Sequence, residues 1–184
     1  MRIGITGSLA SGKSSVVKIL SKKKNIVFSA DKIVKKIYSS KKFKQNVSKK
    51  FKLRSDKIKE EIKNKLLNGK ISLKDLGKII HPIVRKEMIN FSNKNKNKNV
   101  IFFEIPLLIE SKLTKYFDAV ILVVAPKKIR LNRYIKNGGN KKMFNFLDKN
   151  QMSQRKKVKY CDYIIVNNHS KTVLKNRIAA IIKD

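Results

Sequence analysis

Five short apolar runs predict the strands of one sheet, and the residues between them carry helical patterns. Two of the runs, near residues 100 and 120, are continuous, which is typical of parallel strands buried on both faces. The first two runs flank a helical pattern over about residues 13–23, so they form a βαβ unit and indicate a parallel sheet. The runs are residues 2–6, 25–28, 100–103, 119–124 and 162–166.

Between the second and third runs, residues 40–98 are helical in pattern and poor in strands. Apolar residues recur there at helical spacing, and Ser72 with Asp75 resembles a capping box that opens a helix. We expect that helix to end at His81-Pro82 and a new one to begin at Pro82, which suits a first helical turn. The stretch is predicted to be a helical insertion in the sheet domain.

The first run leads into a loop in which Gly7, Gly12, Lys13 and Ser14 match G-x-x-x-x-G-K-[ST], the phosphate-binding loop. The glycines let backbone N–H groups point at an anion, and the next helix adds the positive end of its dipole. We expect Lys13 to contact the β- and γ-phosphates and Ser14 to bind Mg²⁺, which takes oxygen ligands. The order of strand, loop and helix argues against a chance glycine–serine turn. The predicted ATP-binding residues are Gly7, Ser8, Leu9, Ala10, Ser11, Gly12, Lys13, Ser14 and Ser15.

This loop occurs in kinases, GTPases and ATPases, and the rest of the chain favours a small-molecule kinase. The Asn-Lys-x-Asp motif with which GTPases read the base is missing, and 184 residues are too few for the larger sheets of motor ATPases. We predict one α/β domain with a three-layer P-loop kinase fold around a five-stranded parallel sheet. Its predicted parts are a core at about 1–38, 99–135 and 160–184, a helical substrate-binding insertion at 39–98 and a short lid at 136–159.

Asp31 follows the second run almost directly, and residues that follow parallel strands line the ligand crevice of such sheets. We expect Asp31 near the phosphate loop, where a carboxylate can orient an acceptor hydroxyl and accept its proton. A role at a helix N-terminus is the alternative, because Asp31 also opens a helical pattern.

The chain carries 46 Lys and Arg against 12 Asp and Glu, a formal net charge of +34. A basic surface that binds nucleic acid is one explanation. Compositional drift is the other, since Lys, Asn and Ile share A/T-rich codons and no basic patch is interleaved with aromatic residues. Drift predicts lysines scattered over the surface, so we expect small-molecule partners and no specific nucleic acid.

No apolar run reaches the length of a membrane span, and the N-terminus enters a strand without a signal peptide. The lone Cys161 cannot form an internal disulfide, which suits a reducing compartment. We expect a cytoplasmic protein without a membrane partner, as a monomer or a weak oligomer.

Several short segments match one known family in order along nearly the whole chain. Besides the phosphate loop they are Ala30-Asp31, His81-Pro82, Pro106-Leu107-Leu108 with Glu110, Arg133, Gln151-Met152, Asp162-Tyr163-Ile164-Ile165 and Asn167-Asn168. In these segments the chain resembles the dephospho-CoA kinase family. The resemblance implies ATP-dependent phosphorylation of the ribose 3′-hydroxyl of dephospho-CoA, the last step of coenzyme A biosynthesis. A kinase for a nucleoside or a nucleoside monophosphate, or a non-enzymatic protein that binds nucleotide or nucleic acid, is the alternative.

The resemblance also implies roles for single residues. Asp31 matches the family's presumed base. Arg133 falls in the helix before the lid, where it would stabilise the transferring group together with lid lysines such as Lys136. Lys13, which holds the phosphates, is the third predicted catalytic residue. The implied substrate contacts are Asp31, His81, Arg85, Leu107 and Leu108. Local packing of His81, and solvent exposure of Arg85 and Arg133, are the alternatives.

The chain shows four departures from the family's pattern. Ser29 stands where the family usually has Asp, and Glu104 stands where many members have Asp, which shifts any water-mediated Mg²⁺ contact by one methylene. Ala10 replaces a usual Gly, and a positive φ there would cost on the order of 1 kcal/mol. Lys136-Asn137 replaces a second lid arginine, and a lysine supplies charge without the bidentate fork.

Overall fold

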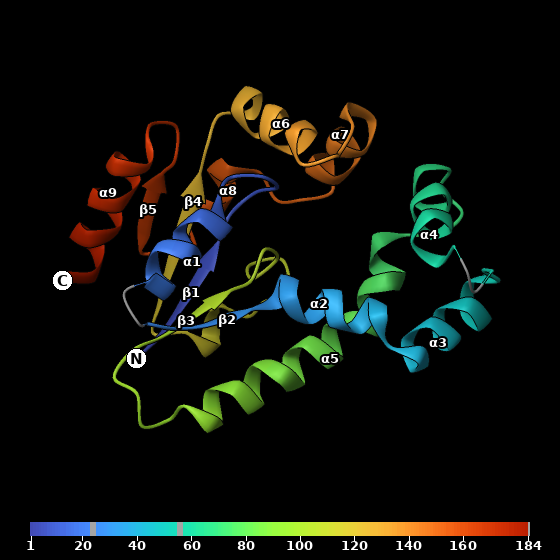
Figure 1. Ribbon diagram of the computed structural model, residues 1–184, viewed down its shortest axis with the longest axis horizontal. Coiled ribbons are helices and arrows are strands. Elements are labelled where there is room, and N and C mark those ends of the chain that lie inside the picture. The colour runs from blue at the N-terminus through green and yellow to red at the C-terminus, as the bar shows by residue number, and fades with distance from the viewer. Residues whose placement is uncertain (23–24, 55–56, 184) are drawn as a thin grey trace. The chain divides into compact units, whose positions relative to one another are not determined.

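The computed structural model describes residues 1–22, 25–54 and 57–183. The chain forms two compact units, drawn in Figure 1. One unit contains Met1–Ser29 and Asn95–Asp184 and holds the sheet, and the other contains Ala30–Lys94 and is helical.

The first unit is built on a five-stranded parallel sheet, as the apolar runs predict. The strand order β2-β3-β1-β4-β5 places β1 at the centre. The residues that follow β1 therefore start at the middle of the side of the sheet where the parallel strands have their carboxyl ends. The strands are β1 (Arg2–Thr6), β2 (Ile26–Ser29), β3 (Ile101–Glu104), β4 (Ala119–Val124) and β5 (Tyr163–Val166).

One face of this sheet is covered by α1 (Lys13–Lys22) and α9 (Lys171–Lys183). The buried core there joins Ile5 and Phe102 of the sheet to Val16 of α1. All three side chains are completely buried, so burial of apolar surface holds α1 and the loop before it against the sheet.

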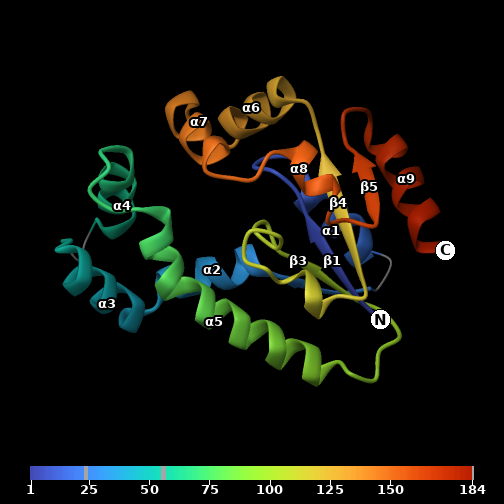
Figure 2. The ribbon, with the colours of Figure 1, turned by 180° about the vertical axis from the view of Figure 1, so that it is seen from behind.

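The other face is covered by the segment after β3 and by α8 (Gln154–Val158), which lies beside β4 (Figure 2). Leu108 packs so closely on β1 that a methyl group at Gly4 would come within 2.6 Å of its Cδ1 atom. With helices or packed segments on both faces, the unit has the three-layer α/β fold that the sequence predicts. After β4, α6 (Lys127–Lys136) and α7 (Lys141–Lys149) pack against each other.

The second unit is a group of helices in which α2 packs against α3 and α5. Ser72 and Asp75 form the expected capping box before α5, since the Ser72 hydroxyl accepts the Asp75 N–H at 3.1 Å and the Asp75 carboxylate accepts the Ser72 N–H at 3.3 Å. The helices are α2 (Ala30–Ser39), α3 (Lys41–Phe51), α4 (Ile58–Leu67) and α5 (Leu73–Lys94).

The predicted helix break at His81-Pro82 is wrong, because α5 runs through it without interruption. A proline inside a helix removes one backbone hydrogen bond and crowds the carbonyl four residues earlier. Leu76 before the proline and Met88 after it are both buried, and α5 packs against α2. Tertiary packing on both sides of Pro82 thus outweighs the local penalty.

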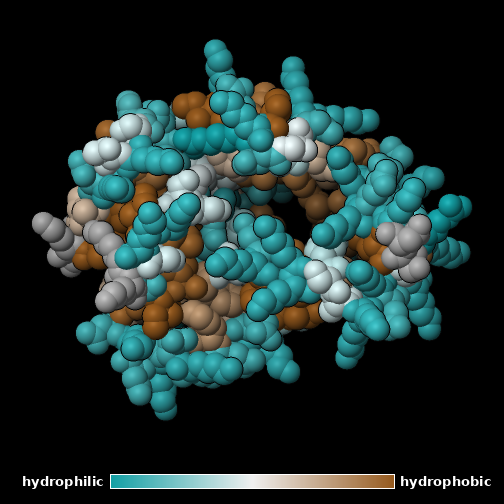
Figure 3. Space-filling view, viewed as in Figure 1, coloured by the Kyte–Doolittle hydropathy of each residue, from teal (hydrophilic) through white to brown (hydrophobic). Residues whose placement is uncertain are grey.

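Exposed lysines occur on helices throughout both units, for example Lys18 of α1, Lys35 of α2, Lys128 of α6 and Lys175 of α9. On the face seen in Figure 3, hydrophilic residues are likewise spread widely. Compositional drift predicts such a scatter, and it stays a prediction. Within the described ranges, no helix has the length and apolar character needed to cross a membrane.

Candidate active site

The loop after β1 has the backbone that the glycine pattern predicts. Gly7 and Gly12 both have positive φ angles, of 156° and 99°. A methyl group at Gly7 would collide with the carbonyl oxygen of Val123, and one at Gly12 would collide with the side-chain nitrogen of Asn167. Glycine is therefore required at both positions, by backbone angle and by the space available.

Ala10 adopts a φ of 58°, the left-handed angle that the sequence made a concern at this position. This conformation destabilises the folded state of a residue with a side chain by roughly 1–2 kcal/mol. A glycine avoids that cost, but its greater freedom in the unfolded chain lowers the stability by about 0.4–1 kcal/mol.

Ala10→Gly should therefore raise the free energy of unfolding by about 0.5 kcal/mol, as measured by urea denaturation. The matched control is Ala180→Gly in the ordinary helical turn of α9, which should lower it by about 1 kcal/mol. Equal losses of stability in the two variants would show that the backbone at Ala10 is not strained.

Lys13, the first residue of α1, is held inside the loop by the loop's own carbonyl groups. Its ammonium nitrogen lies 2.9 Å from the Gly7 oxygen and 3.1 Å from the Ser8 oxygen, and the residue is only 7% exposed. These bonds fix a positive charge beside the N-terminus of α1, where the backbone N–H groups also favour an anion. The charge and the N–H groups fit the phosphates of a nucleotide.

Arg133 lies on the other side of the loop, on α6. Its guanidinium donates to the Ser11 carbonyl at 3.1 Å and to the Asn167 carbonyl at 3.0 Å. The Asn167 side chain donates to the same Ser11 carbonyl at 2.9 Å. Arg133 and Asn167, both noted in the sequence, thus bridge the loop to the end of β5.

Arg130 of α6, which no sequence motif singles out, supports the loop. It is 5% exposed, and it donates to the Leu9 carbonyl at 3.2 Å and to the Asp148 carboxylate at 2.5 Å. Gln151 accepts the Leu9 N–H at 2.9 Å. A cleft of about 410 Å³ lies here, lined in part by Ser8, Arg130 and Gln151. The one available signal was Asp148, the single acidic residue between Lys127 and Lys159.

Glu104, at the end of β3, places a buried carboxylate beside the loop. It is 3% exposed, and its two oxygens accept the hydroxyl groups of Ser14 at 3.1 Å and of Ser29 at 2.7 Å. Among the described residues no group of three His, Cys, Asp or Glu side chains could hold a metal ion. Mg²⁺ binds through one or two protein oxygens together with phosphate and water, so the Ser14 hydroxyl and the Glu104 carboxylate are a suitable donor set.

The segment after β3 is fixed by a second carboxylate, that of the half-buried Glu110. Glu110 forms an ion pair of 2.9 Å with Lys157 of α8, which is completely buried, and it accepts the Met152 N–H at 3.1 Å. In the same segment Leu108 is completely buried in the core, while Leu107 keeps some exposed surface.

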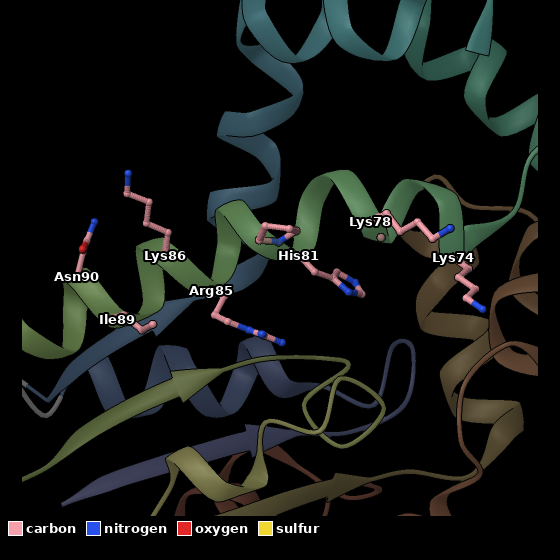
Figure 4. A pocket seen from close by; sticks show the side chains of 9 residues that line it. Lys74, Lys78, His81, Arg85, Lys86, Ile89 and Asn90 are labelled. Atoms are coloured by element: carbon pink, nitrogen blue, oxygen red, sulfur yellow. The ribbon is translucent and has the colours of Figure 1, made fainter. Parts of the chain in front are cut away.

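In the helical unit, His81 and Arg85 project from the same side of α5, together with Lys74 (Figure 4). They line a pocket of about 710 Å³ along this helix. Partial burial, with a smaller effect of the Arg85 charge, lowers the pKa of His81, so the neutral imidazole is favoured. Asp31 lies in the first turn of α2 and is exposed.

A phosphate loop follows the central strand of a layered α/β sheet, with a buried lysine and a serine–carboxylate pair beside it. This arrangement is that of a P-loop nucleotide-binding protein. The family model described as dephospho-CoA kinase matches residues 1–172. The dephospho-CoA kinase of Rickettsia conorii is 33% identical over 186 residues, 100% of this chain and 97% of the relative. That of Fusobacterium nucleatum is 34% identical, covering 91% of this chain and 90% of the relative.

Among solved structures, the dephospho-CoA kinase of Campylobacter jejuni matches with a TM-score of 0.67 and 26% identity, covering 99% of this chain and 95% of that chain. The chain belongs to the dephospho-CoA kinase family.

Proposed function

We propose that this protein transfers the γ-phosphoryl group of ATP to the ribose 3′-hydroxyl of dephospho-CoA, giving CoA and ADP. The observation that carries the proposal is the complete phosphate loop, with Lys13 buried inside it, in a chain of this family. In the reaction a bond forms between the 3′-oxygen and the γ-phosphorus, the bond from the γ-phosphorus to the bridging oxygen of ADP breaks, and the hydroxyl proton leaves to a base.

On the donor side, the loop N–H groups and Lys13 hold the β- and γ-phosphates, and the predicted ATP contacts run from Gly7 to Ser15. Phosphoryl transfer depends mainly on positioning and on charge stabilisation. Ser14 and Glu104 are the residues that would hold Mg²⁺, which when bound neutralises charge on the phosphate oxygens. Arg133, fixed beside Ser11, adds positive charge near the transferring group.

On the acceptor side, Asp31 orients the 3′-hydroxyl and accepts its proton, with His81 and Arg85 as further contacts. Dephospho-CoA carries a diphosphate, and a pocket that includes Arg85 and Lys74 has the charge to attract it. The neutral imidazole of His81 can donate one hydrogen bond and accept another. Leu107 is the member of the Leu107-Leu108 pair with surface to offer a substrate.

A coupled ADP-release assay tests the proposed acceptor. Dephospho-CoA should give the highest kcat/KM in a panel that also contains nucleosides and nucleoside monophosphates. Turnover on a nucleoside alone would replace the proposal with a nucleoside kinase. Tight, salt-dependent binding to polyanions without any phosphoryl transfer would replace it with a nucleic-acid-binding role. A cytoplasmic location and a monomeric or weakly oligomeric state stay predictions from the sequence.

Gly77 gives a more local test of the acceptor side. A methyl group at Gly77 would lie 3.0 Å from Cε1 and 3.2 Å from Nε2 of His81, so the imidazole would have to move. A glycine within a helix otherwise costs about 1 kcal/mol relative to alanine.

Gly77→Ala should therefore leave the protein at least as stable while raising KM for dephospho-CoA several-fold and leaving KM for ATP unchanged. Asn93→Ala, at an exposed position of the same helix, is the control and should change neither KM. An unchanged KM for dephospho-CoA in Gly77→Ala would argue that His81 packs locally and does not contact the substrate.

A further inference from the structure

Ser29 and Glu104 are direct neighbours across two parallel strands. They are partners in the register of β2 and β3, each at the last residue of its strand. The Ser29 hydroxyl donates to Oε2 of Glu104 at 2.7 Å, and both residues are buried, at 8% and 3% exposure. The pairing of β2 with β3 therefore places the Ser29 hydroxyl within hydrogen-bonding distance of the Glu104 carboxylate.

The other oxygen of the same carboxylate, Oε1, accepts the Ser14 hydroxyl at 3.1 Å. A glutamate side chain has several rotatable bonds, so a carboxylate held at one oxygen only would sample many orientations. With Oε2 held by Ser29, Oε1 is directed at Ser14. Ser14 is exposed and opens onto the phosphate loop, whereas Ser29 is not.

The Glu104 carboxylate is buried beside two hydroxyl groups. Among the residues that the structure describes, no Lys, Arg or His forms an ion pair with it, and its hydrogen bonds come from the two serine hydroxyls. A buried anion in this situation is costly unless a positive charge is supplied. A hydrated Mg²⁺ on the nucleotide would supply that charge, and the oxygen donors at Ser14 and Glu104 suit this ion.

From this geometry we infer that Ser29 is a positioning residue for the metal–nucleotide complex, acting through Glu104. Its hydroxyl holds the Glu104 carboxylate with Oε1 directed at Ser14. The oxygen atoms of Ser14 and Glu104 that would hold Mg²⁺ are therefore in place before the nucleotide binds. The inference rests on the Mg²⁺-nucleotide part of the proposed function and does not depend on the identity of the acceptor. A serine that merely satisfied a buried carboxylate would affect stability and have no selective effect on Mg²⁺.

The test measures ADP binding by calorimetry, over a range of Mg²⁺ concentrations and in the presence of a chelator, for the full-length protein. Ser29→Ala should raise the Mg²⁺ concentration needed for half-maximal tightening of ADP binding by about 10-fold, the usual scale for residues that orient a metal ligand. ADP affinity in the chelator should stay unchanged. Ser29→Thr, which keeps the hydroxyl, should restore the wild-type Mg²⁺ dependence.

The matched control is Ser48→Ala in α3, since the Ser48 hydroxyl is buried without a hydrogen-bond partner among the described residues. It should leave the Mg²⁺ dependence unchanged. If Ser29→Ala does not fold, Ser29→Cys replaces it, because a thiol of similar size is a weaker donor and should give a smaller rise in the same direction.

An unchanged Mg²⁺ dependence in the Ser29 variants, or an equal loss of ADP affinity with and without Mg²⁺, would overturn the inference. Because no acceptor is present in this experiment, a failure of dephospho-CoA to react would overturn the proposed function alone.

Discussion

Replacing Asp31 with Asn is expected to lower kcat for dephospho-CoA by about 10²–10⁴-fold, the range for loss of a general base. The amide keeps the size of the side chain but cannot take the proton of the 3′-hydroxyl. ATP affinity should remain within twofold of the wild type, because Asp31 is assigned to the acceptor. Steady-state kinetics with dephospho-CoA, together with calorimetric titration of ATP, measure the two effects separately.

The control for this variant is Glu60→Gln, which makes the same chemical change at an exposed position of α4. It should leave kcat unchanged. A helix-terminal role for Asp31 predicts a different result, namely a loss of about 0.3–1 kcal/mol of stability with near-normal turnover. Near-normal turnover in Asp31→Asn would therefore remove Asp31 as the base.

Lys13→Ala is expected to lower both ATP affinity and turnover, with kcat/KM falling by about 100-fold or more, as when one preorganised charge or donor at the reacting group is removed. The physical reason is the burial of its ammonium group among the carbonyls of the loop, which fixes it where the phosphate charge is carried. Calorimetry with ATP and the ADP-release assay measure the two losses.

Lys18→Ala is the matched control, because Lys18 lies on the same helix and is exposed. Lys18→Ala removes the same charge from the chain, and it should change neither ATP affinity nor turnover. If Lys18→Ala weakened ATP binding as much as Lys13→Ala, the overall positive charge of the chain would account for nucleotide binding and the loop geometry would not.

Much of the fold could be predicted from the apolar pattern, because each strand of the parallel sheet is a short run buried by helices and packed segments on both sides. β1 and β4 were found at the expected residues. The break expected in α5 was wrong for a physical reason: a proline rule is local, whereas the packing of Leu76 and Met88 that keeps α5 intact is not. Local propensity is a weak guide where tertiary contacts are strong.

In the site, the loop was predictable because its backbone angles require glycine at Gly7 and Gly12, and the positive φ of Ala10 was also anticipated as a risk. The side chains that support the loop from α6 could not be predicted. Arg130 contacts Leu9 and Asp148, which are distant from it in sequence. The isolated acidic residue Asp148 was a signal, but it did not indicate which basic residue would bind it.

The Leu107-Leu108 pair shows a related limit. The sequence of two adjacent leucines does not indicate which side chain lies in the core. In the structure Leu108 is completely buried. The pairing of Ser29 with Glu104 is of the same kind, because it depends on strand register, and that register places the two partners side by side from positions far apart in the chain.

The most direct test of the central claim is the position of the new phosphate after incubation of the purified protein with ATP, Mg²⁺ and dephospho-CoA. Mass spectrometry shows whether one phosphoryl group has been added, and phosphorus–proton NMR shows which oxygen carries it. The account predicts stoichiometric ADP and a product with the phosphate on the ribose 3′-oxygen. Unchanged dephospho-CoA, or a phosphate on any other oxygen, would contradict it.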